Sequence, residues 1–433
     1  RMAIGGRARW PARVTNLWTL GESAGARRKV HKMLERKARV SIAVATVLAL
    51  LSGCEGLPQD RNSQAGEEWG LGAELEILAG TLDSPPESSF DQVAGVARFQ
   101  DGEIVVLDGG MNSRITVLSP SGEFLRTIGR NGEGPGEFGW VTSVQAGADD
   151  SLFVFDAGLQ RLTVFSPDGS SVRSADYRPV EGERLRTVTR LGGNTWLGRG
   201  MDTPLQAPLN QIVQDTIILG LLDPTLEQLD LVATLPSLMS TGISIGGQIG
   251  LGAAAFTPIA LHATSGGCIF VSTADTSSIQ VYSSDGEYLK SFEGPGARRP
   301  VTREHVEDFG ENRLRGAPED QQRVFRSAFL DAAHAESLPY YFQMLADPWG
   351  YLWLQEYSPP VGLGSHWYVV TPTGRVVTEF VLPASIRVYG IDEDGLLGMK
   401  RGEFDEEMIV GLPIVSRPEG LAEPLSECQP HSG

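Results

Sequence analysis

The chain has 433 residues, 41% of them hydrophobic, with 52 glycines and 26 prolines. This composition predicts a large core with many turns and few long helices, built as one large all-β domain or as two domains. The formal net charge is −18, and the residues after position 53 hold 25 basic and 52 acidic side chains, a charge of −27. We therefore exclude nucleic acid as a partner, because phosphate binding requires clustered basic side chains.

Residues 33–53 have the pattern of a lipoprotein signal peptide. Basic residues at 29–39 precede an uncharged apolar run at 40–51, which is too short to span a bilayer and has the length of a signal-peptide core. The run ends in Leu-Ser-Gly-Cys, which resembles a bacterial lipobox, and the thiol of Cys54 would carry the lipid. The alternative, a buried apolar helix with a chance cysteine, leaves the order of these three features unexplained.

These features predict export and a lipid anchor at the bacterial cell envelope, on its periplasmic face or at the cell surface, with the membrane as a partner. We expect residues 1–32 to be an upstream extension that the mature protein lacks. Residues 54–68 are polar and rich in Gly, Gln and Ser, and we expect them to form a flexible tether.

Short β-prone runs separated by turns follow from Trp69 at nearly even spacing. The strand pattern at 69–79 stands alone, whereas the next two units align over their middle strands, VVLDGGMNSRITVLSPSG against FVFDAGLQRLTVFSPDG. Repeats of ~40–50 residues with this pattern predict the blades of a β-propeller. The expected blades cover residues 93–129, 141–177, 185–235, 259–294, 340–382 and 385–413.

The sixth blade has only three expected strands, and the lone strand at 69–79 can supply its fourth. The sequence therefore predicts an all-β fold, a six-bladed β-propeller of four-stranded antiparallel blades over residues 69–415, closed by an N-terminal strand and followed by a tail at 416–433. The Gly-Glu-Gly-Pro-Gly-Glu-Phe connector and the Asp-x5-Arg-Ile-x-Val-x-x-Pro-x-Gly pattern resemble those of NHL-repeat-like six-bladed propellers, which occur in many bacterial lipoproteins.

Two segments interrupt the repeats. The insertion at 299–337 predicts a helix capped by Thr302 and a second helix at 318–333, which either cap the central channel or pack on the side of blade five. The uncharged segment at 235–258 is more apolar than a solvent loop, and we expect a partner site or a plug inside the channel.

Two features of blades one and two invite a functional interpretation. Asp108 with Arg114, and Asp156 with Arg161, recur at equivalent positions, which favours a repeated structural ion pair over a pair of ligands. The glycine-rich connector at 129–136 lacks the Gly-Lys-Ser/Thr ending of a phosphate loop and leads to a strand, so we interpret it as a tight crossover between blades.

Cys268 and Cys428 remain once Cys54 is acylated. They would pair in an oxidising compartment, but Cys268 lies in an apolar strand and burial alone also explains it.

The resemblance also implies candidate functions, because related-looking propellers include lactonases and a peptidyl-hydroxyglycine lyase that hold calcium or zinc in the channel. Such sites need convergent carboxylate or imidazole ligands. The six expected inner strands contain no carboxylate. They carry the candidate channel residues Arg98, Arg186, Arg190, His262 and Arg387.

We therefore expect no metal and no cofactor, and a channel suited to an anionic or polar ligand. The predicted function is a ligand-binding, protein-binding or scaffolding module, more in keeping with a non-enzyme. The alternative is a hydrolase or lyase that acts in the channel on a small polar substrate.

Overall fold

The computed structural model describes residues 69–109, 113–147, 149–178, 184–192, 195–202, 211–223, 225–245, 248–314, 319, 322, 334–359, 364–418 and 428. The predicted signal peptide, Cys54 and the tether lie outside these residues, as does nearly all of the predicted second helix. No helix in the described ranges is long and apolar enough to cross a membrane.

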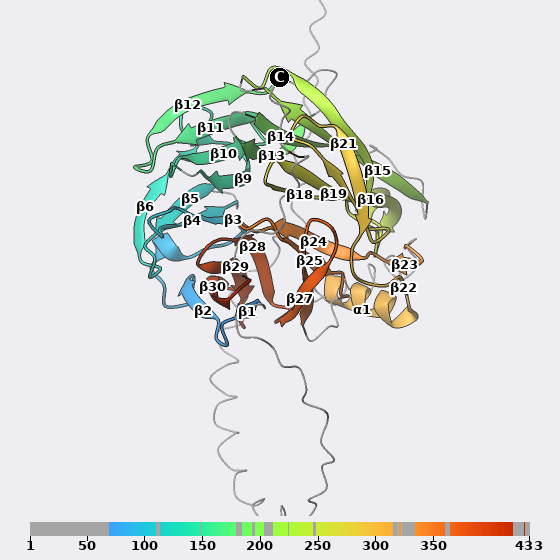
Figure 1. The fold of residues 1–433 in the computed structure, drawn as a ribbon. Helices are drawn as coiled ribbons and strands as arrows, with labels where there is room; N and C mark the ends of the chain where they lie inside the picture. Colours follow the sequence, from blue (N-terminus) through green and yellow to red (C-terminus); the bar gives the residue numbers. More distant parts are fainter. Residues whose placement is uncertain are drawn as a thin grey trace, which may run out of the picture. The chain divides into compact units, whose positions relative to one another are not determined.

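Six antiparallel sheets form the blades of a propeller, as Figure 1 shows. Blade one contains β3 (Val93–Arg98), β4 (Ile104–Asp108), β5 (Arg114–Leu118) and β6 (Phe124–Ile128). Blade two contains β9 (Val141–Ala146), β10 (Leu152–Asp156), β11 (Arg161–Phe165) and β12 (Ser171–Asp176). Blade four contains β18 (Leu261–Ser265), β19 (Cys268–Ser272), β20 (Ser278–Tyr282) and β21 (Tyr288–Glu293). Blade five contains β24 (Tyr341–Ala346), β25 (Leu352–Glu356), β26 (Ser365–Val370) and β27 (Val376–Leu382).

The innermost strands lie around a common centre. In blade six, β28 (Ile386–Ile391) is innermost, followed by β29 (Gly395–Arg401) and β30 (Glu407–Ser416). Strand β3 contacts β9 and β28, and β24 contacts β18 and β28. The prediction of a six-bladed, all-β propeller is confirmed.

The second strand of a blade is buried on both faces because it lies between two neighbouring blades. All five residues of β4 are buried, and its side chains alternate between two apolar layers. Val105 and Leu107 pack toward blade two, whereas Ile104 and Val106 pack toward blade six. This two-sided burial explains why the second strands of blades one, two and four read as nearly continuous apolar runs.

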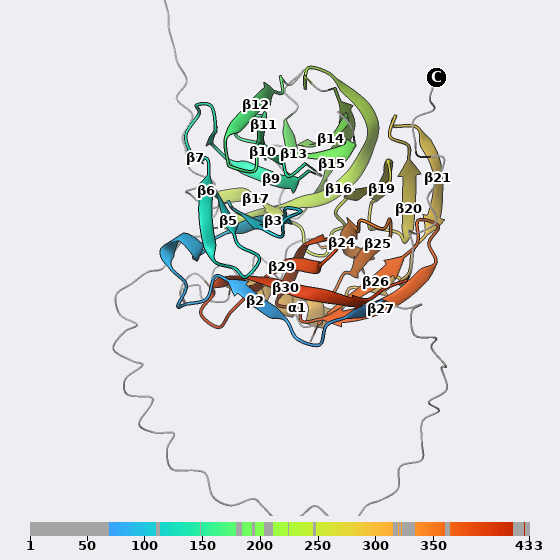
Figure 2. The same ribbon diagram turned by 60° about the vertical axis from the view of Figure 1, so that its left-hand side comes forward.

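The N-terminal segment closes the ring, as predicted, although it forms two short strands instead of one. Strands β1 (Gly70–Leu71) and β2 (Glu76–Ala79) both pair antiparallel with β30, and Figure 2 shows β2 alongside β30. Trp69 is buried against Trp349, Tyr351 and Trp353, with ring centroids 5.3, 5.7 and 5.4 Å away. The start of the chain is therefore held by blades five and six.

Side chains also join blade six to blade one. The buried Glu407 accepts a hydrogen bond from Val93 N at 2.6 Å and pairs with Arg401 at 2.7 Å. The hydroxyl of Tyr389 donates to Val93 O. The closing joint thus combines backbone pairing with side-chain hydrogen bonds and an ion pair, which the strand patterns in the sequence do not predict.

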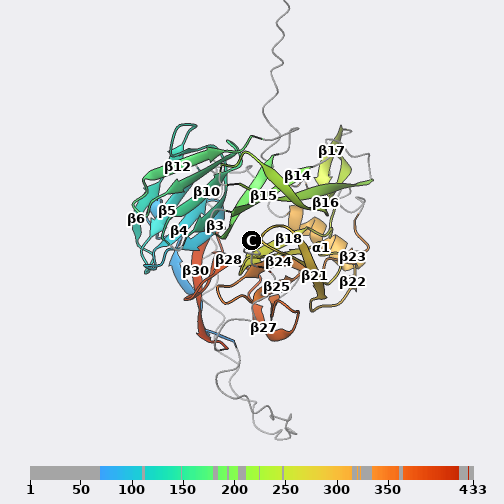
Figure 3. The same ribbon diagram turned by 45° about the horizontal axis from the view of Figure 1, so that its top comes forward.

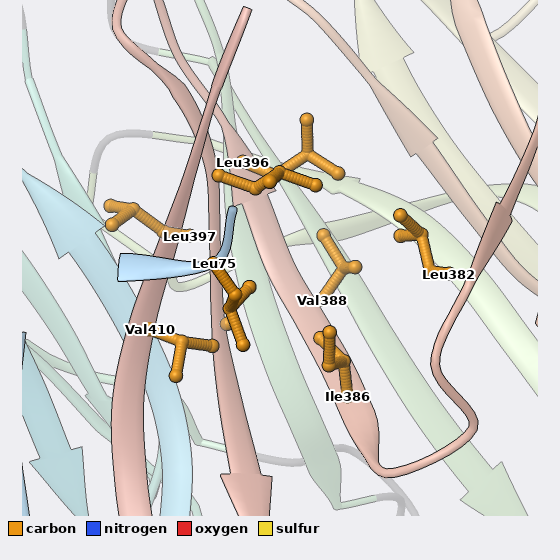
Figure 4. Close-up of a pocket in the computed structure, with 9 residues that line it drawn as sticks. Leu75, Leu382, Ile386, Val388, Leu396, Leu397 and Val410 are labelled. Carbon is orange, nitrogen blue, oxygen red and sulfur yellow. The ribbon is translucent and has the colours of Figure 1, made fainter. Parts of the chain in front are cut away.

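A small apolar cavity lies within this joint (Figure 4). Its volume is about 10 Å³, and Leu75, Val388 and Val410 are among its lining residues. A space of this size holds no more than one water molecule, and its apolar lining offers that molecule no polar partner. It is a packing gap beneath the N-terminal segment, too small for a ligand.

Blade three corrects the expected boundary at residue 235. Its strands are β13 (Leu185–Gly192), β14 (Thr195–Asp202), β15 (Ile212–Leu222), β16 (Leu229–Ile245) and β17 (Gln248–Ala253). Blade three therefore extends beyond the expected end at residue 235, and most of the uncharged segment forms a long hairpin that adds a fifth strand. A role as a partner site or as a plug stays a prediction. Backbone pairing satisfies the amide groups of this glycine-rich stretch without requiring an alternating side-chain pattern.

The insertion between blades four and five contains α1 (Arg303–Leu314), flanked by β22 (Arg299–Pro300) and β23 (Ser337–Leu338). Thr302 caps α1, because its hydroxyl accepts from His305 N at 3.3 Å. Phe256, which follows β17, lies 5.4 Å from Phe309 between ring centroids. Figure 3 shows β16 and β17 on the same side of the propeller as α1, β22 and β23. The insertion thus packs against the segment after β17, and a role as channel cap stays a prediction.

The structure joins Cys268 and Cys428 in a disulfide, with Cα atoms 5.0 Å apart. Both cysteines are buried in the apolar layer between blades four and five. The bond ties a residue from the end of the chain to β19 across a sequence separation of 160.

We predict that Trp69→Ala lowers the free energy of unfolding by about 3–5 kcal/mol, because it removes a buried aromatic side chain from the closing joint. Urea unfolding at pH 7 measures the change. Leu82→Ala is the control, since Leu82 is 63% exposed. An equal loss in both variants would contradict a closing role for Trp69.

We predict that Cys428→Ala lowers the free energy of unfolding by roughly 2–4 kcal/mol under oxidising conditions, because the bridge constrains the unfolded chain. Thermal unfolding with and without reductant measures it. Reductant should lower the Tm of the unmodified protein and leave the Tm of the variant unchanged. A reductant-insensitive Tm in both proteins argues against the bond.

Candidate functional site

The innermost strands share a backbone irregularity near one end. Pairing with the second strand skips one residue between Val93 and Gly95, and likewise in blades two, three, five and six. Such β-bulges redirect a side chain out of the regular alternation. The skipped residues are Ala94, Thr142, Arg186, Phe342 and Tyr389.

Polar side chains of the inner strands bind the backbone of the next blade. Thr142 Oγ1 donates to Arg186 O at 2.5 Å, and Ser143 Oγ donates to Val188 O at 3.1 Å. Gln343 Nε2 donates to Val388 O at 2.7 Å. These bonds satisfy the free edges of the inner strands and leave the cationic side chains as candidates for ligand binding.

The structure places the predicted cations in different surroundings. Arg98 pairs with Asp392 at 2.9 Å and with Asp394 at 3.5 Å, so blade six neutralises it. Arg387 is exposed and lies 5.1 Å from the ring centroid of Tyr389. Arg190 lies 4.9 Å from the ring centroid of Phe153. These three residues do not form one site.

Arg186 and His262 belong instead to a group on blades three and four. The Arg186 guanidinium lies 5.6 Å from the ring centroid of the half-exposed Trp140, and its Nε is buried with no hydrogen-bond partner among the described residues. Arg199 on β14 is the cross-strand partner of Thr187. Arg199 and His262 each keep some accessible surface.

The electrostatics connect these residues. Burial lowers the pKa of His262 to about 4, and the positive charge of Arg199 acts in the same direction. Burial also lowers the pKa of Arg199, with a smaller contribution from the charge of Arg186. The charges of Arg186 and Arg199 therefore act on each other, and the charge of Arg199 disfavours protonation of His262. No ion pair with an acidic side chain is found for these three residues in the described part of the chain.

Arg199 was not identified from the sequence, because all of the candidate channel residues came from the expected innermost strands. It lies in the second strand of blade three. A signal for Arg199 was present in the sequence: a charged residue interrupts a second strand, and a strand that is buried on both faces rarely contains an arginine.

The repeated acids bind the backbone in both blades. Asp108 accepts from Gln92 N at 3.1 Å and lies 3.5 Å from Arg114. Asp156 accepts from the backbone N–H groups of Gly139, Trp140 and Leu159 at 2.5, 3.0 and 2.9 Å. These contacts fix the connector that enters each inner strand.

The arginines of the two repeats hold the preceding connectors. Arg161 donates to the carbonyl oxygens of Glu133, Gly134 and Glu137. Within the same connector, a Cβ on Gly129 would lie 2.2 Å from Phe138, and its φ of +70° favours glycine. Asp108, Arg114, Asp156 and Arg161 thus contribute to architecture, as does the glycine-rich segment.

Blade five contains a separate polar cluster. His366 lies 3.1 Å from Glu356 through Nδ1 and 3.0 Å from Glu379 through Nε2, and Glu356 also pairs with Arg299 at 3.2 Å. The two carboxylates approach different nitrogens of one imidazole and do not converge on a shared point. Across the described ranges, no group of three or more His, Cys, Asp or Glu side chains is arranged to hold a metal.

Comparisons with known proteins agree with this fold. A family model, DUF5128, described as a 6-bladed beta-propeller, matches residues 85–181. NHL repeat-containing protein 3 from Mus musculus is 37% identical over 81 residues, which are 18% of this chain and 23% of that protein. The match therefore spans about a quarter of that relative's length.

Solved structures resemble the chain at low identity. A member of the DUF4221 family from Bacteroides vulgatus has a TM-score of 0.49 and 11% identity, covering 81% of this chain and 98% of its own. A putative exported protein from Bacteroides fragilis has a TM-score of 0.44 and 12% identity, covering 79% and 95%. A gluconolactonase from Xanthomonas campestris has a TM-score of 0.43 and 12% identity, covering 78% and 89%. We draw no inference about activity from these likenesses.

We predict that the His262→Val substitution removes a pH dependence of stability. The pKa of His262 is lowered in the folded protein to about 4 from an ordinary 6.5. The unfolded chain therefore binds more protons between these values, and stability falls as the pH falls through this window. The charged group that acts on His262 is Arg199, which is itself affected by the charge of Arg186.

Urea unfolding at pH 7 and pH 4.5 measures this effect. The variant should gain up to about 3 kcal/mol relative to the unmodified protein between the two pH values. A difference that does not change with pH contradicts the lowered pKa of His262.

The six sheets and the matching family model lead to one conclusion: this chain is a six-bladed β-propeller, and 81 of its residues are similar to an NHL repeat-containing protein.

Proposed function

We propose that this propeller is a binding or scaffolding module of the bacterial cell envelope, anchored by lipid on Cys54, and that its channel receives a small polar or anionic ligand. The observation that carries the ligand class is the group formed by Arg186, Arg199 and His262. Arg186 and Arg199 are cationic, the imidazole of His262 lies close enough to Arg199 for that charge to lower its pKa, and their described surroundings contain no acidic partner.

Two features support placement in the envelope. Residues 33–54 have the order of basic segment, apolar core and lipobox cysteine that lipoprotein signal peptides share. The bond between Cys268 and Cys428 is of a kind that persists in oxidising compartments such as the periplasm.

A hydrolase or lyase that acts in the channel is the alternative function. A metal-dependent form of it would need oxygen or nitrogen ligands converging on one point. Asp392 and Asp394 lie next to the innermost strand of blade six, and both are engaged by Arg98. No observation in the described structure favours this alternative.

We predict that Cys54→Ser transfers the protein from the membrane fraction to the soluble fraction and abolishes incorporation of labelled fatty acid, because the substituted side chain lacks the thiol that is acylated. Fractionation of expressing bacteria and lipid labelling measure both results. Cys428→Ala is the control and should stay membrane-bound and labelled. Unchanged labelling of Cys54→Ser would refute the anchor.

The binding function is tested by capture from envelope extracts with the immobilised protein, followed by analysis of retained small molecules and by metal analysis of the purified protein. Retention of a specific polar or anionic compound supports the proposal. A stoichiometric metal ion together with turnover of a small polar substrate would favour the enzyme.

A further inference from the structure

Equivalent positions in the blades show where blade three departs from the repeat. We compare the residue of the second strand that pairs with the inner strand directly after its bulge. This residue is Leu107 in blade one and Phe155 in blade two. The corresponding residue is Leu397 in blade six and Gln355 in blade five. Leu107, Phe155 and Leu397 pack in the apolar layers between blades. In blade three the same position holds Arg199.

His262 faces this arginine from blade four. It pairs with Val271, and Arg199 pairs with Leu219 on the next strand of its own blade. Val271 and Leu219 belong to the same apolar layer between blades three and four. Because cross-strand partners share a face of the sheet, Arg199 and His262 are directed into that layer.

Three other interfaces fill this place with apolar side chains. Leu107 lies with Val144 between blades one and two, and Phe155 lies with Val188 between blades two and three. Leu397 lies with Val96 between blades six and one. Among the described blade interfaces, a partly buried arginine opposite an imidazole occurs between blades three and four, and a purely structural role in the repeat does not explain it.

Neighbouring donors lack partners as well. Thr187, the cross-strand partner of Arg199, has a buried Oγ1 with no hydrogen bond among the described residues, and the same holds for Arg186 Nε. Burying a cation without a counter-charge is unfavourable by several kcal/mol, and an unpaired buried donor adds to that cost. An acceptor from outside the chain that occupies this space would lower both costs.

We propose that Arg186, Thr187, Arg199 and His262 form a binding site for a small oxyanion, a phosphate or carboxylate group, at the channel side of the interface between blades three and four. The guanidinium of Arg199 can bind two oxygens of such a group at once, and the hydroxyl of Thr187 supplies a further donor. The site specifies the chemical group that the proposed binding function would recognise. It rests on that function, because the anion is taken to be part of a ligand of the channel.

The surroundings restrict what carries the anion. The chain after position 53 has a charge of −27, so its long-range field repels anions and only the local cations attract them. Trp140, beside Arg186, offers a flat apolar surface to the rest of the ligand. We therefore expect a compact molecule with one oxyanion group next to a planar or apolar part.

Titration of the purified protein with inorganic phosphate and with sodium acetate tests the site by calorimetry and thermal unfolding, against sodium chloride at matched ionic strength. We expect saturable binding of one anion per chain and a raised Tm for at least one of the two. A phosphate preference assigns a phosphate-bearing ligand, and an acetate preference assigns a carboxylate. If neither anion exceeds chloride, the proposal is overturned.

Arg199→Leu and Thr187→Val assign the response to these residues. The first introduces the residue type found at the equivalent positions of blades one and six, and the second keeps the side-chain shape without the hydroxyl. Each should weaken anion binding at least tenfold. Arg387→Gln removes an exposed arginine outside the site and should bind as the unmodified protein does. Binding that persists in both site variants overturns the proposal, and Thr187→Val decides alone if Arg199→Leu does not fold.

The outcomes separate this site from the broader function. Loss of anion binding with retained capture of another envelope compound leaves the binding function standing and removes the oxyanion site. Anion binding without any captured compound supports the site and removes the assigned biological ligand.

Discussion

The ring closure at blade six is the constraint on which the other blades depend. Each layer of apolar side chains lies between two blades, so no blade is buried on both faces unless the ring is complete. Pairing of β1 and β2 with β30 completes it, and Trp69 anchors the segment on blade five. Residues near the two ends of the propeller thereby share one sheet, and blades one and six lose their exposed faces together.

Repetition separates architecture from candidate function. Asp108 and Asp156 recur because each accepts hydrogen bonds from backbone amides of the connector that leads into the inner strand of its blade. Arg199 and His262 occur once, at an interface position that holds aliphatic or aromatic side chains in blades one, two and six. A residue that departs from the repeat at a cost in solvation is better explained by a ligand than by the fold.

The sequence predicted more of the fold than of the site. Turn residues and alternating strands are local signals, so the six blades and the closing segment near Trp69 were predicted correctly. The end of blade three was placed too early, at residue 235, because glycine-rich hairpins carry little side-chain pattern. Glu407, which clasps Val93 from a separation of 314 residues, carried no local signal.

The sequence alone determined the number of blades, the regular spacing of their strands, the acidic composition and the lipobox pattern at Cys54. Each of these follows from composition or from patterns of neighbouring residues. Only the tertiary structure decided which cations are neutralised. Arg98 meets Asp392 from a separation of 294 residues, whereas Arg199 and His262 meet across a blade interface without an acid. Charge pairing depends on distance in space, and ring closure sets that distance.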